Sequence, residues 1–259
     1  MQKLIFSKIA QMSSFNFGDV LSQSIDLFKK VWVEGFVHLL LIFVVTIPAI
    51  VIMYISVIAL FGLDYILVTG VPGAISGDEF SFAMLPALLG GFLLTVFVAA
   101  VMQTFSIAIM AHFYKVCKNA DMGTNTDTGG YFSFLMNGNF KKVLALSFTM
   151  MGVTLLAALL CYFPLFYVIV PMSLVLVIFA FNPELSVTEL IRAAFKMGNK
   201  IWLATFGMII LAGIMAQLGM IACGIGVFFT AIFSRIPLYY IYKSTIGFDE
   251  AQQETPETF

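Results

Sequence analysis

Apolar runs of 18 or more residues follow one another along most of this chain, and they limit its fold more than any other feature. At about 1.5 Å of rise per residue, a helix of that length crosses a hydrocarbon core of about 30 Å. The composition agrees, since 61% of the residues are hydrophobic and only 10% are charged, whereas soluble domains carry about 25% charged residues. We therefore predict an all-α, polytopic integral membrane protein.

The apolar runs predict six transmembrane helices, with expected bounds of 35–61, 83–113, 141–161, 164–181, 201–220 and 223–243. The second run is too long for one perpendicular crossing, so we expect it to tilt or to project past the membrane. After it, we predict a polar connection at 114–140, whose centre, MGTNTDTGG, has the composition of a loop. Residues 1–244 then form one transmembrane domain, and we predict that 245–259 is an acidic, disordered cytoplasmic tail.

Two short amphipathic segments precede apolar runs: NFGDVLSQSIDLFKKVW at 16–32 and SVTELIRAAFKMGNKIW at 186–202. Ser186 and Glu189 have the spacing of a capping box, and Asn16 and Asp19 form a variant of it. Apolar side chains recur at helical spacing in both segments, with charged residues facing elsewhere. Because such helices lie in the membrane interface, we predict two cytoplasmic-side interfacial helices, at 16–31 and 186–200.

The two amphipathic segments match position by position when they are aligned on Trp32 and Trp202, which lie 170 residues apart. A weaker third copy places Lys142 opposite Lys200, and two spans follow each copy. This pattern favours a fold built from a repeated unit, an interfacial helix plus a helical hairpin. The alternative is that any amphipathic helix entering a membrane needs caps, lysines and an interfacial Trp.

The distribution of basic residues predicts the orientation. With the N-terminus inside, all 13 Lys and Arg lie on the cytoplasmic side or, for Arg235, in the cytoplasmic half of the last span. Both termini are then cytoplasmic. The first 15 residues lack the apolar core of a signal peptide, so we expect no cleavage there. A net charge of −1 argues against nucleic acid as a partner.

Three stretches carry a resemblance to a known group: FNFGDVLSQSIDLFKKVW, NPELSVTELIRAAFKMGNKIW and, in the last hairpin, GIGVFFTAIFSRIPLYYIY. The pattern covers nearly the whole chain. It resembles a broad group of bacterial six-helix membrane proteins that includes the membrane domain attached to some glycerophosphodiester phosphodiesterases. The resemblance implies a six-helix fold in a bacterial inner membrane. In that group the hydrolase is a separate soluble domain, so no catalytic residues carry over.

Arg235 is the charged residue placed deepest in a predicted span, where an Arg costs at least about 2.5 kcal/mol at full depth. Its side chain could extend to the inner interface beside Tyr239. It could instead bind a lipid phosphate or a substrate anion between helices, as basic pockets on the cytoplasmic side do. Further candidates for contact with anionic lipid are Tyr239, Lys30, Lys200 and Arg192.

Glu34, His38 and His112 are predicted near the cytoplasmic ends of the first two spans. Two histidines and a carboxylate could hold zinc, and His38 could sense protons. A polar cluster at the level of the lipid headgroups explains these residues equally well, and we predict no bound metal and no cofactor.

Gln103 and Gln217 lie near the middle of predicted spans, and hydroxyl groups from Thr46, Ser106, Thr149 and Thr154 are expected to join helices by hydrogen bonds. Cys161 and Cys223 both map to outer turns. They either form a disulfide in an oxidising periplasm or stay as free buried thiols.

These features predict a non-enzymatic inner-membrane accessory or scaffold protein. Its expected partners are membrane lipids, anionic ones above all, and another membrane protein or a second copy of the chain. A transporter of a hydrophobic or amphipathic solute is one alternative, and it would have a cavity that reaches the mid-membrane beside Gln103, Gln217 or Arg235. An intramembrane enzyme is the other alternative, with the two histidines as its only candidate catalytic groups.

Overall fold

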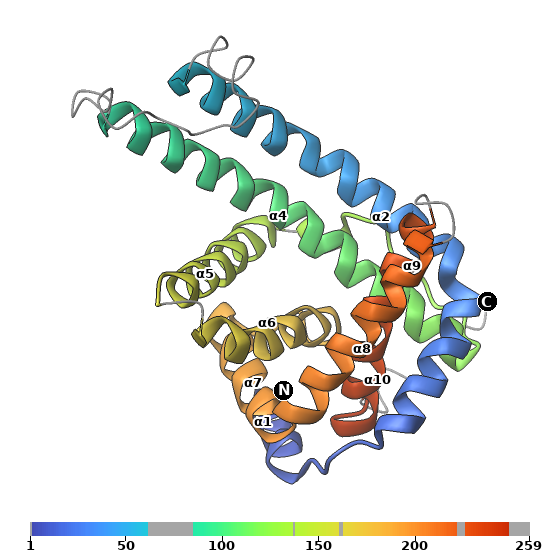
Figure 1. Ribbon diagram of the computed structural model, residues 1–259. Helices are drawn as coiled ribbons and strands as arrows, with labels where there is room; N and C mark the ends of the chain where they lie inside the picture. The colour runs from blue at the N-terminus through green and yellow to red at the C-terminus, as the bar shows by residue number, and fades with distance from the viewer. Residues whose placement is uncertain (1, 62–84, 137, 161–162, 222–225, 249–259) are drawn as a thin grey trace.

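The computed structural model describes residues 2–61, 85–136, 138–160, 163–221 and 226–248, and every regular element within these ranges is a helix (Figure 1). The all-α fold class is therefore confirmed. In chain order the elements are α1 (Gln2–Gln11), α2 (Phe17–Phe61), α4 (Leu85–Met122), the 3-10 turn η2 (Ser133–Leu135), α5 (Phe140–Leu159), α6 (Phe163–Phe181), α7 (Val187–Lys200), α8 (Trp202–Ile221), α9 (Val227–Thr230), the 3-10 helix η3 (Ala231–Arg235) and α10 (Ile236–Thr245).

Five helices in the described ranges are long and apolar enough to cross a membrane: α2, α4, α5, α6 and α8. The bounds of α5, α6 and α8 closely match those of the third, fourth and fifth predicted spans. The predicted sixth span, 223–243, differs because it is divided among α9, η3 and α10. Pro237 has no N–H to continue an α-helix, and just before it the N–H of Ile236 bonds to the carbonyl of Phe233 in a tighter turn.

The first amphipathic segment does not form a separate helix. It is continuous with the first apolar run in α2, whose 45 residues extend about 68 Å. The side chains that it buries, Val20, Ser24, Leu27 and Val31, follow a stripe rotated from the expected one, since Phe17 is exposed. The second segment does form its own helix, α7, which ends at a bend at Ile201. The predicted capping box of α7 is confirmed in both directions.

Helix α4 also exceeds its prediction. The expected loop begins at residue 114, but the helix continues to Met122, about two and a half turns further, and the loop follows from Gly123. Figure 1 shows α2 and α4 side by side as the two longest helices, running in opposite directions. This extension places Asp121 opposite α10, where the site described below is built.

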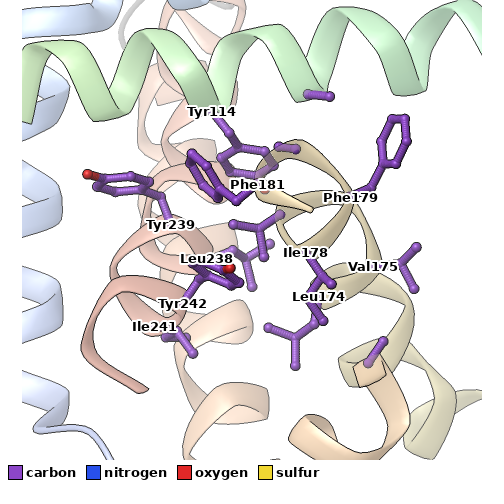
Figure 2. Packing of buried hydrophobic residues seen from close by; sticks show 14 of the residues in the cluster. Tyr114, Leu174, Val175, Ile178, Phe179, Phe181, Leu238, Tyr239, Ile241 and Tyr242 are labelled. Carbon is purple, nitrogen blue, oxygen red and sulfur yellow. The ribbon is translucent and has the colours of Figure 1, made fainter. Parts of the chain in front are cut away.

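Helix α6 lies at the centre of the packed core. Its sequence is apolar on all sides, as expected of a helix surrounded by others, and most of its residues from Val168 onward are buried. Figure 2 shows the rings of Tyr114, Phe181 and Tyr239 gathered where α4, α6 and α10 meet. The core therefore joins the last helix to the long helix α4.

The chain after α10 packs for a few residues before the description ends. Ile246 is buried, and the ring of Phe248 lies 4.7 Å from that of Phe181. The tail that we expected to be disordered from residue 245 is therefore packed as far as residue 248. The rest of the tail, the predicted outer loop at 62–82, Cys161 and Cys223 lie outside the described residues. Cys117 is a buried free thiol.

Candidate functional site

Arg235 ends η3 at the junction of three helices. Next to it, Ile232 fills the space beside Gly35 of α2, and the ring of Phe233 meets that of Phe28 edge-on at 5.6 Å. The guanidinium is half-buried, and within the described ranges it makes no hydrogen bond or ion pair. A cation placed between packed helices in this way is a candidate anion site.

Tyr114 of α4 lies close enough to Arg235 for its phenol to interact with the guanidinium electrostatically. Tyr114 is fully buried, and its hydroxyl has no hydrogen-bond partner among the described residues. Buried hydroxyls nearly always have a partner, so an unpartnered one calls for an explanation such as a bound group. A lipid phosphate between Arg235 and Tyr114 would supply acceptors to both side chains.

The tyrosines that follow Arg235 in the chain are packed inside the protein. Tyr239, Tyr240 and Tyr242 are all buried, with 0%, 5% and 3% of their surface exposed. Tyr239 and Tyr240 donate hydrogen bonds to the two oxygens of Asp121, at 2.7 and 2.8 Å. The hydroxyl of Tyr239 is therefore occupied by Asp121, and contact of Tyr239 with lipid stays a prediction.

Lys243 completes this cluster with an ion pair to Asp121 at 2.5 Å, and the carboxylate is only 12% exposed. Sequence reasoning missed Asp121 because it placed this residue in a loop. The available signal was the helical pattern of Lys115, Lys118 and Asp121 after the second apolar run. The cluster closes α10 onto the end of α4, so it fixes the helix that begins directly after Arg235.

An apolar groove runs along α2 and α9, in the part of the chain that precedes Arg235. Its cavity of about 290 Å³ is lined by Phe36, Leu39, Leu40, Phe43, Phe228 and Phe229. The rings of Phe36 and Phe229 are stacked with their centroids 4.6 Å apart. Phe229 precedes Arg235 by six residues, which is about 10 Å along the helix axis. Cation and groove are thus spaced like the headgroup and acyl chain of one lipid.

The other predicted basic contacts are distributed over separate surfaces. Lys30 and Arg192 are exposed, on α2 and α7. Lys200 donates a hydrogen bond to the carbonyl of Ala10 at 2.7 Å, and Lys196 lies 4.9 Å from the ring of Phe6. Helix α1 therefore occupies part of the basic face of α7 that we expected to contact lipid.

His38 and His112 meet between α2 and α4, as their predicted positions implied. The Nε2 of His38 lies 2.8 Å from the Nδ1 of His112. Their other nitrogens face backbone carbonyls, and Glu34 contributes its carbonyl and not its carboxylate. This arrangement does not fit a zinc site, because the nitrogens that would bind the ion are hydrogen-bonded to one another or to the backbone, and no cluster of potential metal ligands occurs among the described residues.

The mid-membrane glutamines are not brought together. Gln103 of α4 lies 3.3 Å from the hydroxyl of Ser147 on α5, whereas Gln217 is exposed on α8. The hydroxyls of Thr46, Ser106, Thr149 and Thr154 bond to carbonyls of their own helices, so the expectation that they join helices is wrong. Ser147 does join helices, because it also reaches the carbonyl of Ala100 at 2.8 Å.

No protein-family model, curated protein or solved structure matches this chain.

Proposed function

We propose that this protein is a non-enzymatic accessory protein of the bacterial inner membrane that binds an anionic phospholipid. The phosphate lies between Arg235 and Tyr114, and one acyl chain follows the groove beside Phe36. The observation that carries the proposal is the pairing of a half-buried guanidinium that has no bonded partner among the described residues with a buried hydroxyl that has none either.

The lipid also accounts for the energetics of the site. A half-buried charge between helices is costly unless it is paired, and a phosphate offers both charge and hydrogen-bond acceptors. The groove is lined only by apolar side chains, which suits an acyl chain and not a polar solute. Arg235 and two of the groove residues, Phe228 and Phe229, lie in the segment that follows α8, which the resemblance to bacterial six-helix membrane domains also includes.

In this proposal the membrane topology has six spans, with both termini in the cytoplasm. Helices α9, η3 and α10 follow one another without a gap over 19 residues, 227–245. With 1.5 Å per α-helical and 2.0 Å per 3-10 residue, the run extends about 31 Å, which is enough to cross the hydrocarbon core. The positive-inside rule then places the end of α10 in the cytoplasm, and Arg235 lies about 15 Å before that end, near the middle of the run.

The repeated unit remains part of the proposal in a reduced form. Helix α7 with the α8 hairpin keeps the expected order of amphipathic helix and spans, and in the first copy the two parts are fused in α2. Such fusion is compatible with a common unit whose linker became helical.

A transporter of an amphipathic solute is the second candidate. It would use the same groove and Arg235, with lipid-like solutes passing along α2. The placement of Gln103 against Ser147, and of Gln217 on the exposed side of α8, supports binding over transport, because these polar groups do not converge on a path. An intramembrane enzyme is the weakest candidate. A catalytic histidine is usually oriented by a carboxylate, but the nearby carboxylate of Asp127 accepts a hydrogen bond from the N–H of Gly129 and orients neither histidine.

Native mass spectrometry of the full chain in mild detergent tests the lipid proposal. We expect co-purified phospholipid of anionic class, and Arg235→Ala should lower its occupancy about 10-fold or more, since a hydrogen bond to a charged group contributes about 1.5 to 3 kcal/mol. Tyr114→Phe should lower it less. Lys29→Ala is the control, because that side chain is exposed on α2 and pairs with Asp26. Equal lipid occupancy in Arg235→Ala and Lys29→Ala would overturn the proposal.

A further inference from the structure

His38 and His112 form an unbroken line of hydrogen-bonding contacts from α2 to the loop after α4. The Nδ1 of His38 lies 2.5 Å from the carbonyl oxygen of Glu34, and the two rings meet at 2.8 Å. The Nε2 of His112 lies 3.0 Å from the carbonyl oxygen of Gly129 and 3.1 Å from the hydroxyl of Thr128. The two histidines are 1% and 6% exposed, so water does not complete these contacts.

The number of protons on this line determines its charge. A carbonyl only accepts, so the bonds to Glu34 and Gly129 each require an N–H, and the contact between the rings requires a third proton. Two neutral imidazoles carry only two N–H groups. The arrangement that uses both carbonyls therefore holds one extra proton, and the pair has a charge of about +1.

A neutral arrangement also satisfies every ring nitrogen. Each histidine then carries its proton on Nδ1, so His38 still donates to Glu34 and His112 donates to His38. The free Nε2 of His112 accepts from the hydroxyl of Thr128 in place of donating to Gly129. The two states differ only at Nε2 of His112, where one proton exchanges the Gly129 carbonyl for the Thr128 hydroxyl.

We propose that His38 and His112 form one proton-binding site, in which a single proton switches the Nε2 of His112 between the Thr128 hydroxyl and the Gly129 carbonyl. A second extra proton is excluded, because two N–H groups would then face each other across the 2.8 Å contact between the rings. The rings of Tyr131 and Phe113 pack against the pair and keep it in register. This site goes beyond the lipid proposal and does not depend on it.

The charged and titratable groups around the pair come from three places. On α2, Glu34 lies one turn before His38 and its side chain is exposed. On α4, Lys115 follows His112. Asp127 lies in the loop and Tyr131 at the end of the loop. Lys115 and Asp127 act on His112 with opposite signs, so they partly offset each other. Asp127 also accepts a hydrogen bond from the N–H of Gly129 at 2.8 Å. This bond holds Gly129, whose carbonyl accepts from His112 in the protonated state.

Hydrogen bonds hold the loop in place beside His112. Gly129 has φ of +72°, a conformation that glycine adopts without strain, and Asn119 holds the loop at Thr124 and Thr126. Its middle residues line a polar hollow of about 610 Å³ beside the end of α4. In the proposed topology this hollow faces the cytoplasm, so the site reads cytoplasmic pH.

Nitrogen-15 NMR of the full chain with labelled histidine, in lipid nanodiscs, tests the proposal directly. The chain contains 2 histidines, so every imidazole signal belongs to this pair. From about pH 8 to about pH 4, which covers most histidines in folded proteins, we expect two Nδ1–H tautomers to change together as one proton is taken up. Independent midpoints for the two rings, or two imidazolium ions at the acidic end, would disprove a shared proton.

A substitution in the loop keeps the test independent of core folding. Thr128→Val removes the donor that stabilises the neutral pair, so the midpoint should rise by about 0.4 to 1 pH unit. Thr149→Val is the control, because its hydroxyl bonds to the carbonyl of Ala145 within α5 and does not touch the loop. An unchanged midpoint in Thr128→Val, or an equal shift in Thr149→Val, would overturn the link between the histidines and the loop.

Discussion

The indole Nε1 of Trp202 donates a hydrogen bond to the carbonyl oxygen of Tyr167, at 3.1 Å. Tyr167 lies four residues before Pro171, which has no N–H to bond to this carbonyl within α6. Trp202 therefore supplies the donor that the proline removes. The hydroxyl of Tyr167 donates in turn to Asn199 at 2.6 Å, so the corner between α7 and α8 is attached to α6 by two bonds.

Replacing Trp202 by Phe should lower the free energy of unfolding by about 1 to 3 kcal/mol, because the carbonyl of Tyr167 then has no donor. Unfolding by SDS in mixed micelles measures this value. In a Pro171→Ala background the same substitution should cost less, since the alanine N–H can bond to the carbonyl again. The coupling is the diagnostic result, because loss of ring volume alone would not depend on residue 171.

Trp32→Phe is the control for this cycle. Trp32 occupies the corresponding position in the first amphipathic segment, but it is 43% exposed and packs on Phe229 at 6.1 Å. Its substitution should be additive with Pro171→Ala within about 0.5 kcal/mol. Equal coupling of both tryptophans to residue 171 would mean that the bond to Tyr167 is not what Trp202 contributes.

Local signals in the sequence predicted local structure well. The S-x-x-E spacing predicted the start of α7, because a capping box involves only neighbouring backbone groups. The length of the apolar runs predicted α5, α6 and α8, because a helix that crosses a membrane needs about 20 consecutive apolar residues. The fusion of 16–32 with the first span in α2 was missed, since a change from an amphipathic to an apolar pattern does not by itself end a helix, and α2 continues through Gly35.

Neutralising Asp121 should destabilise α10. In Asp121→Ala, Tyr239 and Tyr240 lose their acceptor and Lys243 loses its ion pair, and we expect a loss of about 3 kcal/mol or more. Hydrogen exchange of the amides in α10 should increase accordingly. Asp26→Ala is the control, because its ion pair with Lys29 is exposed on both sides and contributes about 0 to 1 kcal/mol.

Gly219→Ala should destabilise the contact between α8 and the segment after it. A Cβ atom at Gly219 would lie 2.5 Å from the carbonyl oxygen of Gly226, which is backbone and cannot move aside cheaply. Thr230 also bonds across this contact, to the carbonyl of Ala216 at 2.5 Å. We expect a loss of about 1 to 3 kcal/mol, measured by thermal melting in detergent.

Gly213→Ala on the same helix should have the opposite sign. No atom lies within 4 Å of the position of its added Cβ, so only the higher helix propensity of alanine acts, and it stabilises by up to about 1 kcal/mol. If Gly219→Ala were as stable as Gly213→Ala, the close approach of α8 and Gly226 would be refuted.

The candidate site was predictable only in part. A lone arginine in a predicted span indicated Arg235 from the cost of burying charge, and helix ends indicated that His38 and His112 approach each other. The partners that give these residues meaning are distant in sequence. The packing of α4 and its loop brings Tyr114 near Arg235, Asp121 to Tyr239 and Gly129 to His112. No local pattern in the sequence predicts that packing.

The side of the membrane on which α10 ends distinguishes six spans from five. With the native cysteines replaced, Ser244→Cys and Asn125→Cys place single exposed thiols in the last turn of α10 and in the loop after α4. Six spans put both residues in the cytoplasm, so a membrane-impermeant maleimide should label neither in intact cells and both after lysis. Phe163→Cys, 84% exposed at the start of α6, should be labelled in intact cells as the outer-side control. Labelling of Ser244→Cys without lysis would show that α9, η3 and α10 do not cross the membrane, and Arg235 would then face the outer leaflet.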